Sequence, residues 1–162
     1  MHLRDYILYD DRVELIMTND TICPIFFNAN SGQIHFVYKN GKPSSIKHPG
    51  IYLGYDARNN GFYMHNHHIT GKPAIVVENT FSEGKPIYLY EGISTNPQRQ
   101  VIEIGLQQVL TGKPYNLVGY NCQSFVNIAR QNKNRSEDVE RIGAGLVFGG
   151  LVLLGIKALS RV

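Results

Sequence analysis

Up to about Tyr90, the apolar positions of the chain form short runs of β-branched and aromatic residues separated by turn dipeptides such as Asn40-Gly41. Such runs predict β-strands, because branched and aromatic side chains pack well on a pleated sheet. The sequence Asn59-Asn60-Gly61 predicts a hairpin turn, since Asn and Gly accept a positive φ. The pattern over residues 1–32 predicts no particular element. The predicted strands are Gln33–Tyr38, Gly50–Tyr55, Gly61–His65, Ala74–Val77 and Pro86–Tyr90.

After Thr95 the apolar spacing changes to that of helices. Thr95-Asn96 predicts a helix cap, Pro97 suits a first turn, and Gly112 predicts the end of the helix. A second helix is predicted to begin at or next to Cys122, with apolar residues following at helical spacing. Strands followed by helices, without strict alternation, predict an α+β fold. The apolar positions of the two helices are Val101, Ile102, Gly105, Leu106, Val109 and Leu110, then Phe125, Val126 and Ala129.

The C-terminal segment, residues 136–162, predicts a separate hydrophobic helix that follows a globular domain of residues 1–135. Residues 142–156 contain no charged side chain, and residues 142–159 contain only Lys157. Eighteen helical residues span about 27 Å, close to the ~30 Å of a bilayer core. We therefore expect residues 142–159 to associate with a membrane, with a buried C-terminal helix as the alternative. Glycines in this tail also fit helix–helix packing in an oligomer.

Composition limits the class of protein. With 162 residues, 43% of them hydrophobic, the chain has the size of one folded domain. Its two cysteines, Cys23 and Cys122, are too few for a disulfide scaffold. The charged N-terminus lacks the apolar core of a secretory signal, so we expect a cytoplasmic domain that the tail holds at a membrane. A net charge of +3 without a Lys/Arg-rich run argues against a nucleic-acid partner.

Cys122 is the candidate nucleophile. A cysteine at a helix N-terminus faces unpaired N–H groups and the positive end of the helix dipole, which favour its thiolate. The backbone N–H groups of Cys122 and Gln123 are candidates to bind an oxyanion, and Tyr52 is a further candidate for substrate binding at the rim of the sheet. The alternative is a buried cysteine that packs as a small hydrophobic residue.

The candidate base is His48, which immediately precedes the predicted strand Gly50–Tyr55. His65 ends the next strand of the predicted hairpin, so the two histidines are expected on neighbouring strands. A polar atom of His65 would then hold the His48 ring in one tautomer. The alternative for His48 is an exposed loop histidine. Together with His67 and His68, His65 also permits a metal-site interpretation, but structural zinc normally needs four ligands, so neither a metal nor a cofactor is predicted.

These residues resemble two motifs of the lecithin:retinol acyltransferase-like proteins. His48-Pro-Gly-Ile-Tyr-Leu-Gly is similar to the family's H-box, and Asn121-Cys122-Gln-Ser-Phe is similar to its NC motif, usually NCEHF. The order of His48, His65 and Cys122 matches the family's order. The resemblance covers roughly residues 33–160 and departs from the family at Gln123-Ser124, where Glu-His is usual.

The resemblance implies a circularly permuted, NlpC-type papain-like fold, with an antiparallel sheet packed against helices. It implies a thiol acyltransferase or phospholipase-like hydrolase that forms a thioester on Cys122, with His48 and His65 as the other catalytic residues. The expected substrate is an acyl ester, in particular a membrane lipid. Two alternatives remain: a cysteine peptidase or amidase of the NlpC type, and a non-catalytic, membrane-tethered interaction module.

Overall fold

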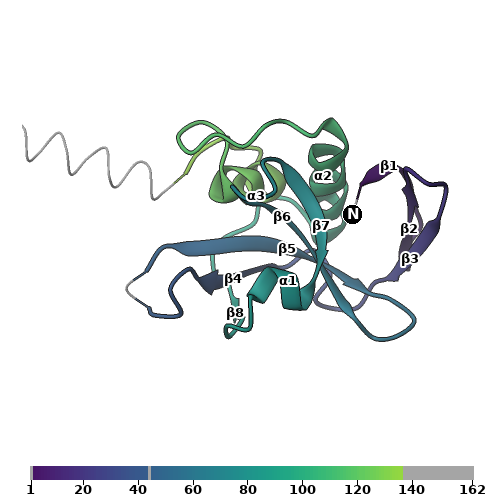
Figure 1. Cartoon of the computed structure of the whole chain (residues 1–162), viewed down its shortest axis with the longest axis horizontal. Coiled ribbons are helices and arrows are strands. Elements are labelled where there is room, and N and C mark those ends of the chain that lie inside the picture. The colour runs from purple at the N-terminus through teal and green to yellow at the C-terminus, as the bar shows by residue number, and fades with distance from the viewer. Residues whose placement is uncertain (1, 44, 137–162) are drawn as a thin grey trace, which may run out of the picture.

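The computed structural model describes residues 2–43 and 45–136 (Figure 1). The described residues form a mixed α+β fold, in which one antiparallel sheet packs against helices, as the sequence predicts. The permuted papain-like arrangement stays a prediction. In chain order, the elements are β1 (Leu3–Leu8), β2 (Arg12–Met17), β3 (Ile22–Phe26), β4 (Ile34–Tyr38), β5 (Lys47–Tyr55), β6 (Gly61–Asn66), β7 (Pro73–Val77), α1 (Glu78–Ser82), β8 (Tyr88–Leu89), α2 (Gln98–Thr111) and α3 (Cys122–Gln131).

The strands are arranged around β5. Along one path the order is β1-β2-β3-β5-β4-β8, and β6 pairs with both β5 and β7. Every one of these pairings is antiparallel. The predicted hairpin between β5 and β6 is confirmed, and Asn59 in its turn has a φ of +64°. Because β5 is central, the residues at its start are enclosed by neighbouring elements.

The strand β5 begins three residues earlier than the sequence suggested. It includes His48, which the sequence placed immediately before the strand and whose alternative interpretation was an exposed loop residue. Val37 of β4 pairs with His48, so the backbone of His48 is fixed by the sheet. Its side chain is only 8% exposed. The interpretation as an exposed loop histidine is therefore wrong.

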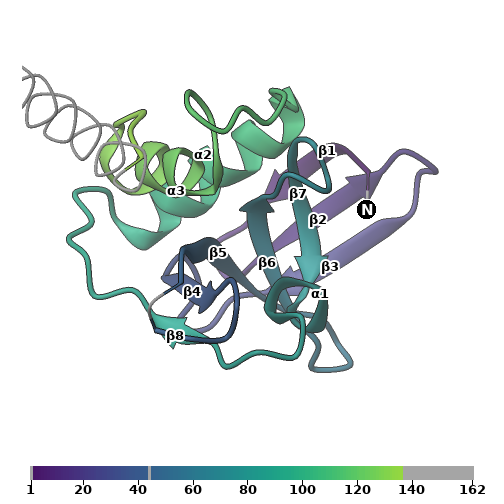
Figure 2. The ribbon, with the colours of Figure 1, turned by 60° about the vertical axis from the view of Figure 1, so that its left-hand side comes forward.

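The two faces of the sheet carry different cores. On one face, α2 and α3 cover the main core, which includes the fully buried Ile51, Leu53 and Met64. The short helix α1 lies on the other side of the sheet from α2 and α3 (Figure 2). There Phe81 packs against Tyr63 in a second, smaller core. Gly105 allows α2 to pack closely on β6, since a Cβ at this position would lie 2.7 Å from a carbon of the Met64 side chain. The candidate residues of β5, β6 and α3 meet at one end of this arrangement.

The helix boundaries are close to the predicted ones, but the first cap is different. Pro97, not Thr95-Asn96, is the N-cap of α2, and no side chain donates or accepts a capping bond there. The amide of Asn96 instead donates to the Ala129 carbonyl at 2.8 Å, which ties the start of α2 to α3. Gly112 ends α2 with a φ of +59°, as predicted. The helix α3 begins at Cys122, also as predicted.

The first 32 residues, for which the sequence pattern gave no assignment, contribute three strands. The strands β1, β2 and β3 form an antiparallel meander that joins the main sheet where Phe26 pairs with Tyr55. Val13, Leu15 and Ile25 are completely buried in the main core. This segment is therefore part of the same hydrophobic core as the helices.

The predicted C-terminal hydrophobic helix, residues 142–159, lies outside the described residues. Within residues 2–43 and 45–136, no helix has the length and apolar character needed to cross a bilayer.

Candidate active site

Cys122 is the first residue of α3, and Asn121 fixes it there. The Asn121 side-chain oxygen accepts hydrogen bonds from the backbone N–H groups of Gln123 and Ser124, both at 3.0 Å. Asparagine is among the best N-cap residues because it satisfies two of the orphan donors of the first turn. The Asn121 amide also donates to the Leu117 carbonyl at 2.7 Å. One side chain thus holds both the start of the helix and the loop before it.

His48 and His65 form a buried pair on neighbouring strands. His48 Nε2 lies 2.9 Å from His65 Nδ1, and the two rings meet at 68° with their centroids 5.1 Å apart. Phe81 of α1 covers both rings at 5.7 and 5.9 Å. Phe81 can approach because position 50 is glycine, where a Cβ would lie 2.6 Å from the Phe81 ring. The glycine at this position therefore lets an aromatic ring shield the histidine pair.

The hydrogen bond between the histidines has two possible directions. If His48 Nε2 carries the proton and donates to His65 Nδ1, then His48 Nδ1 holds a lone pair and can act as a base. The reverse direction places the proton of a neutral His48 on Nδ1, where it cannot accept another. In either tautomer His65 Nε2 is buried and has no partner among the described residues. Only the first direction prepares His48 for base catalysis.

Burial keeps this pair neutral. Desolvation lowers the pKa of His48 to about 2, and the charges of His65, His67 and Lys39 act in the same direction. Desolvation also lowers the pKa of His65 to about 4. A resting imidazolium is therefore disfavoured at neutral pH, and a base here must take its proton during the reaction.

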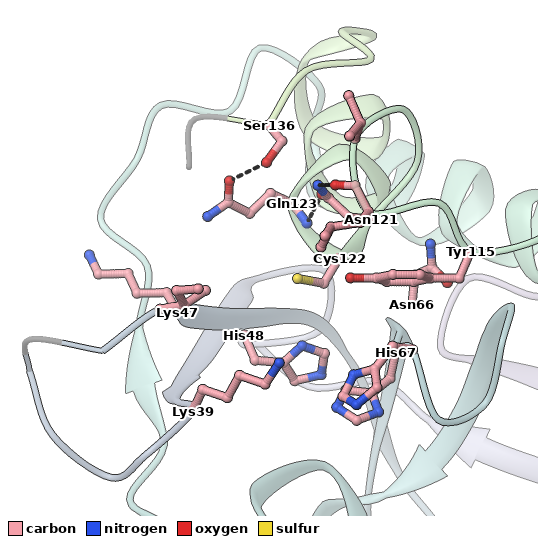
Figure 3. Close-up of a pocket in the computed structure, with 14 residues that line it drawn as sticks. Lys39, Lys47, His48, Asn66, His67, Tyr115, Asn121, Cys122, Gln123 and Ser136 are labelled. Carbon is pink, nitrogen blue, oxygen red and sulfur yellow. Dashed lines mark hydrogen bonds between the residues drawn. The ribbon is translucent and has the colours of Figure 1, made fainter. Parts of the chain in front are cut away.

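The two candidate reactive residues line one pocket with a volume of about 280 Å³. In Figure 3 the side chain of Cys122, from the start of α3, and the ring of His48, from β5, lie in this pocket. Cys122 is half-buried and is among the residues that line the pocket. The pocket is thus where a substrate carbonyl could meet both groups.

Gln123 and Tyr52, the other two predicted site residues, are placed differently. Gln123 lines the pocket, but its backbone N–H already donates to Asn121, and its side-chain oxygen accepts from Ser136 at 2.8 Å. Its predicted role in oxyanion binding therefore requires an oxyanion to compete with the cap. Tyr52 lies outside the pocket lining, where its hydroxyl accepts from Asn28 at 3.3 Å and its ring stacks on His35.

The pocket also contains residues that the sequence motifs did not single out. Tyr115, from the loop before α3, points its hydroxyl toward the Cys122 sulfur in Figure 3, and the charge of Cys122 adds to burial in raising the pKa of Tyr115. The His67 ring stacks on His65 at 5.7 Å and meets His48 edge-on at 4.7 Å. Asn66 is completely buried, and its side-chain oxygen has no partner among the described residues. Tyr115 lies seven residues before Cys122, a separation that carries no periodic signal.

A metal site is not formed by these histidines as they stand. Within the described ranges, no group of three or more His, Cys, Asp or Glu side chains is arranged to hold a metal ion. The side chains of His48, His65 and His67 instead contact one another through ring stacking and one hydrogen bond.

Comparisons with protein-family models, with curated proteins and with solved structures return no match to this chain. The similarity to the lecithin:retinol acyltransferase-like family therefore depends on the short motifs around His48 and Cys122, and membership in that family stays a prediction.

Proposed function

We propose that this chain is a cysteine-dependent acyltransferase or hydrolase that acts on acyl esters through a thioester on Cys122. The observation that carries the proposal is the buried hydrogen bond of 2.9 Å between His48 and His65, beside a half-buried cysteine at the start of a capped helix. A nucleophile, a base and a group that orients the base are the parts that covalent acyl transfer needs.

The mechanism follows from the neutral state of the pair. The Cys122 sulfur attacks the acyl carbonyl while His48 Nδ1 takes the thiol proton, and the Nε2–H of His48 keeps its hydrogen bond to His65 Nδ1 throughout. The tetrahedral intermediate then collapses, the ester C–O bond breaks, and His48 returns the proton to the leaving alcohol. In the second half, His48 takes a proton from water or from an acceptor alcohol or amine as it attacks the thioester; the C–S bond then breaks, and His48 passes this proton to the Cys122 sulfur to restore the thiol.

An acyl substrate is favoured over a peptide by the surroundings of the pocket. The pocket residues Ile46, Leu117 and Val118 are 52%, 69% and 70% exposed. Large apolar side chains gathered around a cavity favour an apolar ligand.

We also propose that residues 142–159 hold this domain at a membrane. Removing them should shift the protein to the soluble cell fraction, and an unchanged distribution would contradict this.

The test is intact-protein mass spectrometry after incubation with mixed phospholipids. We expect a mass increase of one acyl group, retained in Cys23→Ser and lost in Cys122→Ser. His48→Ala should abolish labelling while circular dichroism shows a folded protein. Labelling that persists in both Cys122→Ser and His48→Ala would refute the proposal. Cleavage of peptide amides without lipid labelling would indicate the peptidase alternative, and a Cys122 with no adduct and ordinary alkylation rates would indicate an interaction module.

A further inference from the structure

The electrostatic lining of the pocket indicates which acyl substrates it fits. Its charged lining residues are Lys39 and Lys47, and no Asp or Glu is among the described residues that line it. The acid that acts most directly on the histidines, Glu83, is bound to Lys85. Among the described lining residues, the pocket therefore presents positive charge without a carboxylate beside it.

The two lysines are held differently. The Lys47 ammonium lies over the Phe36 ring, 4.6 Å from its centroid, where the face of the aromatic ring stabilises a cation. The side chain of Lys39, from the end of β4, extends toward the His48 ring (Figure 3). Within the described part of the chain, the Lys39 ammonium forms no ion pair and no hydrogen bond. Of the two lysines that line the described pocket, Lys39 is therefore the one whose ammonium has no aromatic ring beneath it and extends toward His48.

This ammonium acts on the reactive histidine. After burial and the charges of His65 and His67, Lys39 is the next cause that lowers the pKa of His48. A negative group beside Lys39 would offset its charge and make His48 a stronger base. Substrate binding and proton transfer would then support each other.

The mouth of the pocket, in contrast, is apolar. Leu117 and Val118, in the loop that leads to Cys122, and Ile46, directly before Lys47, expose their apolar side chains to solvent. A ligand that covers them must be apolar, whereas a ligand that reaches Lys39 must be negatively charged. A volume of about 280 Å³ holds a headgroup and the first part of a chain, and leaves the rest of the chain against the apolar mouth.

We propose that the acyl substrate of this site is an anionic amphiphile, whose negatively charged headgroup binds Lys39 while its acyl chains lie along Ile46, Leu117 and Val118. This inference rests on the proposed function for its chemistry, but the binding preference is independent of turnover. It predicts discrimination between lipids of equal chain length by charge alone.

The experiment measures binding without catalysis, on the full chain carrying Cys122→Ala. Isothermal titration calorimetry would compare monomeric dihexanoyl phosphatidylglycerol, dihexanoyl phosphatidylcholine and inorganic phosphate. We expect the anionic lipid to bind about fivefold to tenfold more tightly than the zwitterionic one, as a charge-assisted contact would give. Inorganic phosphate, which has the charge but no chain, should bind at least about tenfold more weakly than the anionic lipid.

The charge reversal Lys39→Glu should remove the preference, and Lys133→Glu is the matched control, because it makes the same change of charge at an exposed residue beyond the end of α3. The milder Lys39→Gln serves if the reversal impairs folding. Equal affinity for the two lipids, a preference that survives in the Lys39 variants, or phosphate binding as tight as that of the anionic lipid would each overturn the inference. Failure of the proposed function is recognised separately: the anionic lipid would bind with this preference, but no thioester would form on Cys122.

Discussion

Two histidines of the same sheet, the half-buried His35 and the buried His48, both contact aromatic rings but differ in what their nitrogens contact. His35 Nδ1 lies 2.9 Å from the Tyr63 hydroxyl, and its Nε2 lies 3.4 Å from the Gln33 side-chain oxygen. His48 uses Nε2 for His65, so when Nε2 donates that bond, Nδ1 is the nitrogen that can take a proton. Burial lowers the pKa of both histidines. The difference shows that a neutral, buried imidazole becomes a candidate base only where a nitrogen remains for the nucleophile.

The largest expected effect separates these two histidines by activity. His48→Gln should lower the rate of acyl transfer to Cys122 by about 10²- to 10⁴-fold, the usual contribution of a general base. His35→Gln removes an imidazole with similar surroundings and should change the rate less than about threefold, because glutamine keeps a hydrogen-bonding side chain. Mass spectrometry of samples quenched at successive times would give the acylation rate of each variant relative to the wild type. Similar losses in the two variants would remove the distinction between them.

A smaller effect, on stability, is expected when Phe81 is displaced from the His48–His65 pair. In Gly50→Ala the new Cβ would lie 2.6 Å from the Phe81 ring that covers His48 and His65. Overpacking of this kind should lower the free energy of unfolding by about 1–3 kcal/mol, measured by urea denaturation. Gly119→Ala is the matched control, because its Cβ would meet only ordinary contacts at 3.5 Å or more. Equal stability of Gly50→Ala and the wild type would mean that Phe81 is not tightly packed on the pair.

The smallest effect concerns the pH dependence of stability. Because burial lowers the pKa of His48 to about 2 and of His65 to about 4, the unfolded chain binds more protons than the folded one below about pH 6.5. This contribution is fully present above that pH and is lost as the pH falls, so the two histidines together should lower the free energy of unfolding by about 1.4 kcal/mol between pH 7 and pH 6. Urea midpoints at the two pH values would measure this change.

The same measurement compares the two histidines. His48→Gln should reduce the difference between the two pH values more than His35→Gln does, since His35 is less deeply buried. A pH dependence that is unchanged in His48→Gln would show that folding does not lower the pKa of His48.

The sequence predicted the parts of the site that depend on local pattern. The hairpin turn at Asn59, the end of α2 at Gly112 and the start of α3 at Cys122 each follow from the conformation that one residue type permits. The sequence pattern did not lead us to predict the strand β2, although Val13 and Leu15 alternate with Glu14. The motifs around His48 and Cys122, on which the prediction concentrated, lie further along the chain. A period of two over residues 12–17 was the signal that could have found it.

Other features depend on distances between elements and were beyond a pattern-based prediction. Tyr52 lies four residues after His48 on β5, so about 13 Å of extended strand separates them. That separation places Tyr52 beside His35 instead of the pocket. The roles of Lys39 and Tyr115 in the pocket arise only when their loops are brought to the ends of β5 and α3. Pairing of residues distant in sequence is set by the sheet register and by packing, which no short motif contains.

The cap at Asn121 explains why a good capping residue of another type would not serve equally at this position. Serine and aspartate can accept from the first turn of a helix, but neither has an amide to donate to the Leu117 carbonyl as Asn121 does. An aspartate would keep the start of the helix and release the loop, so the thiol would stay in place while the apolar mouth moved. One side chain therefore links two separate properties of the pocket, the position of the Cys122 thiol and the shape of the entrance.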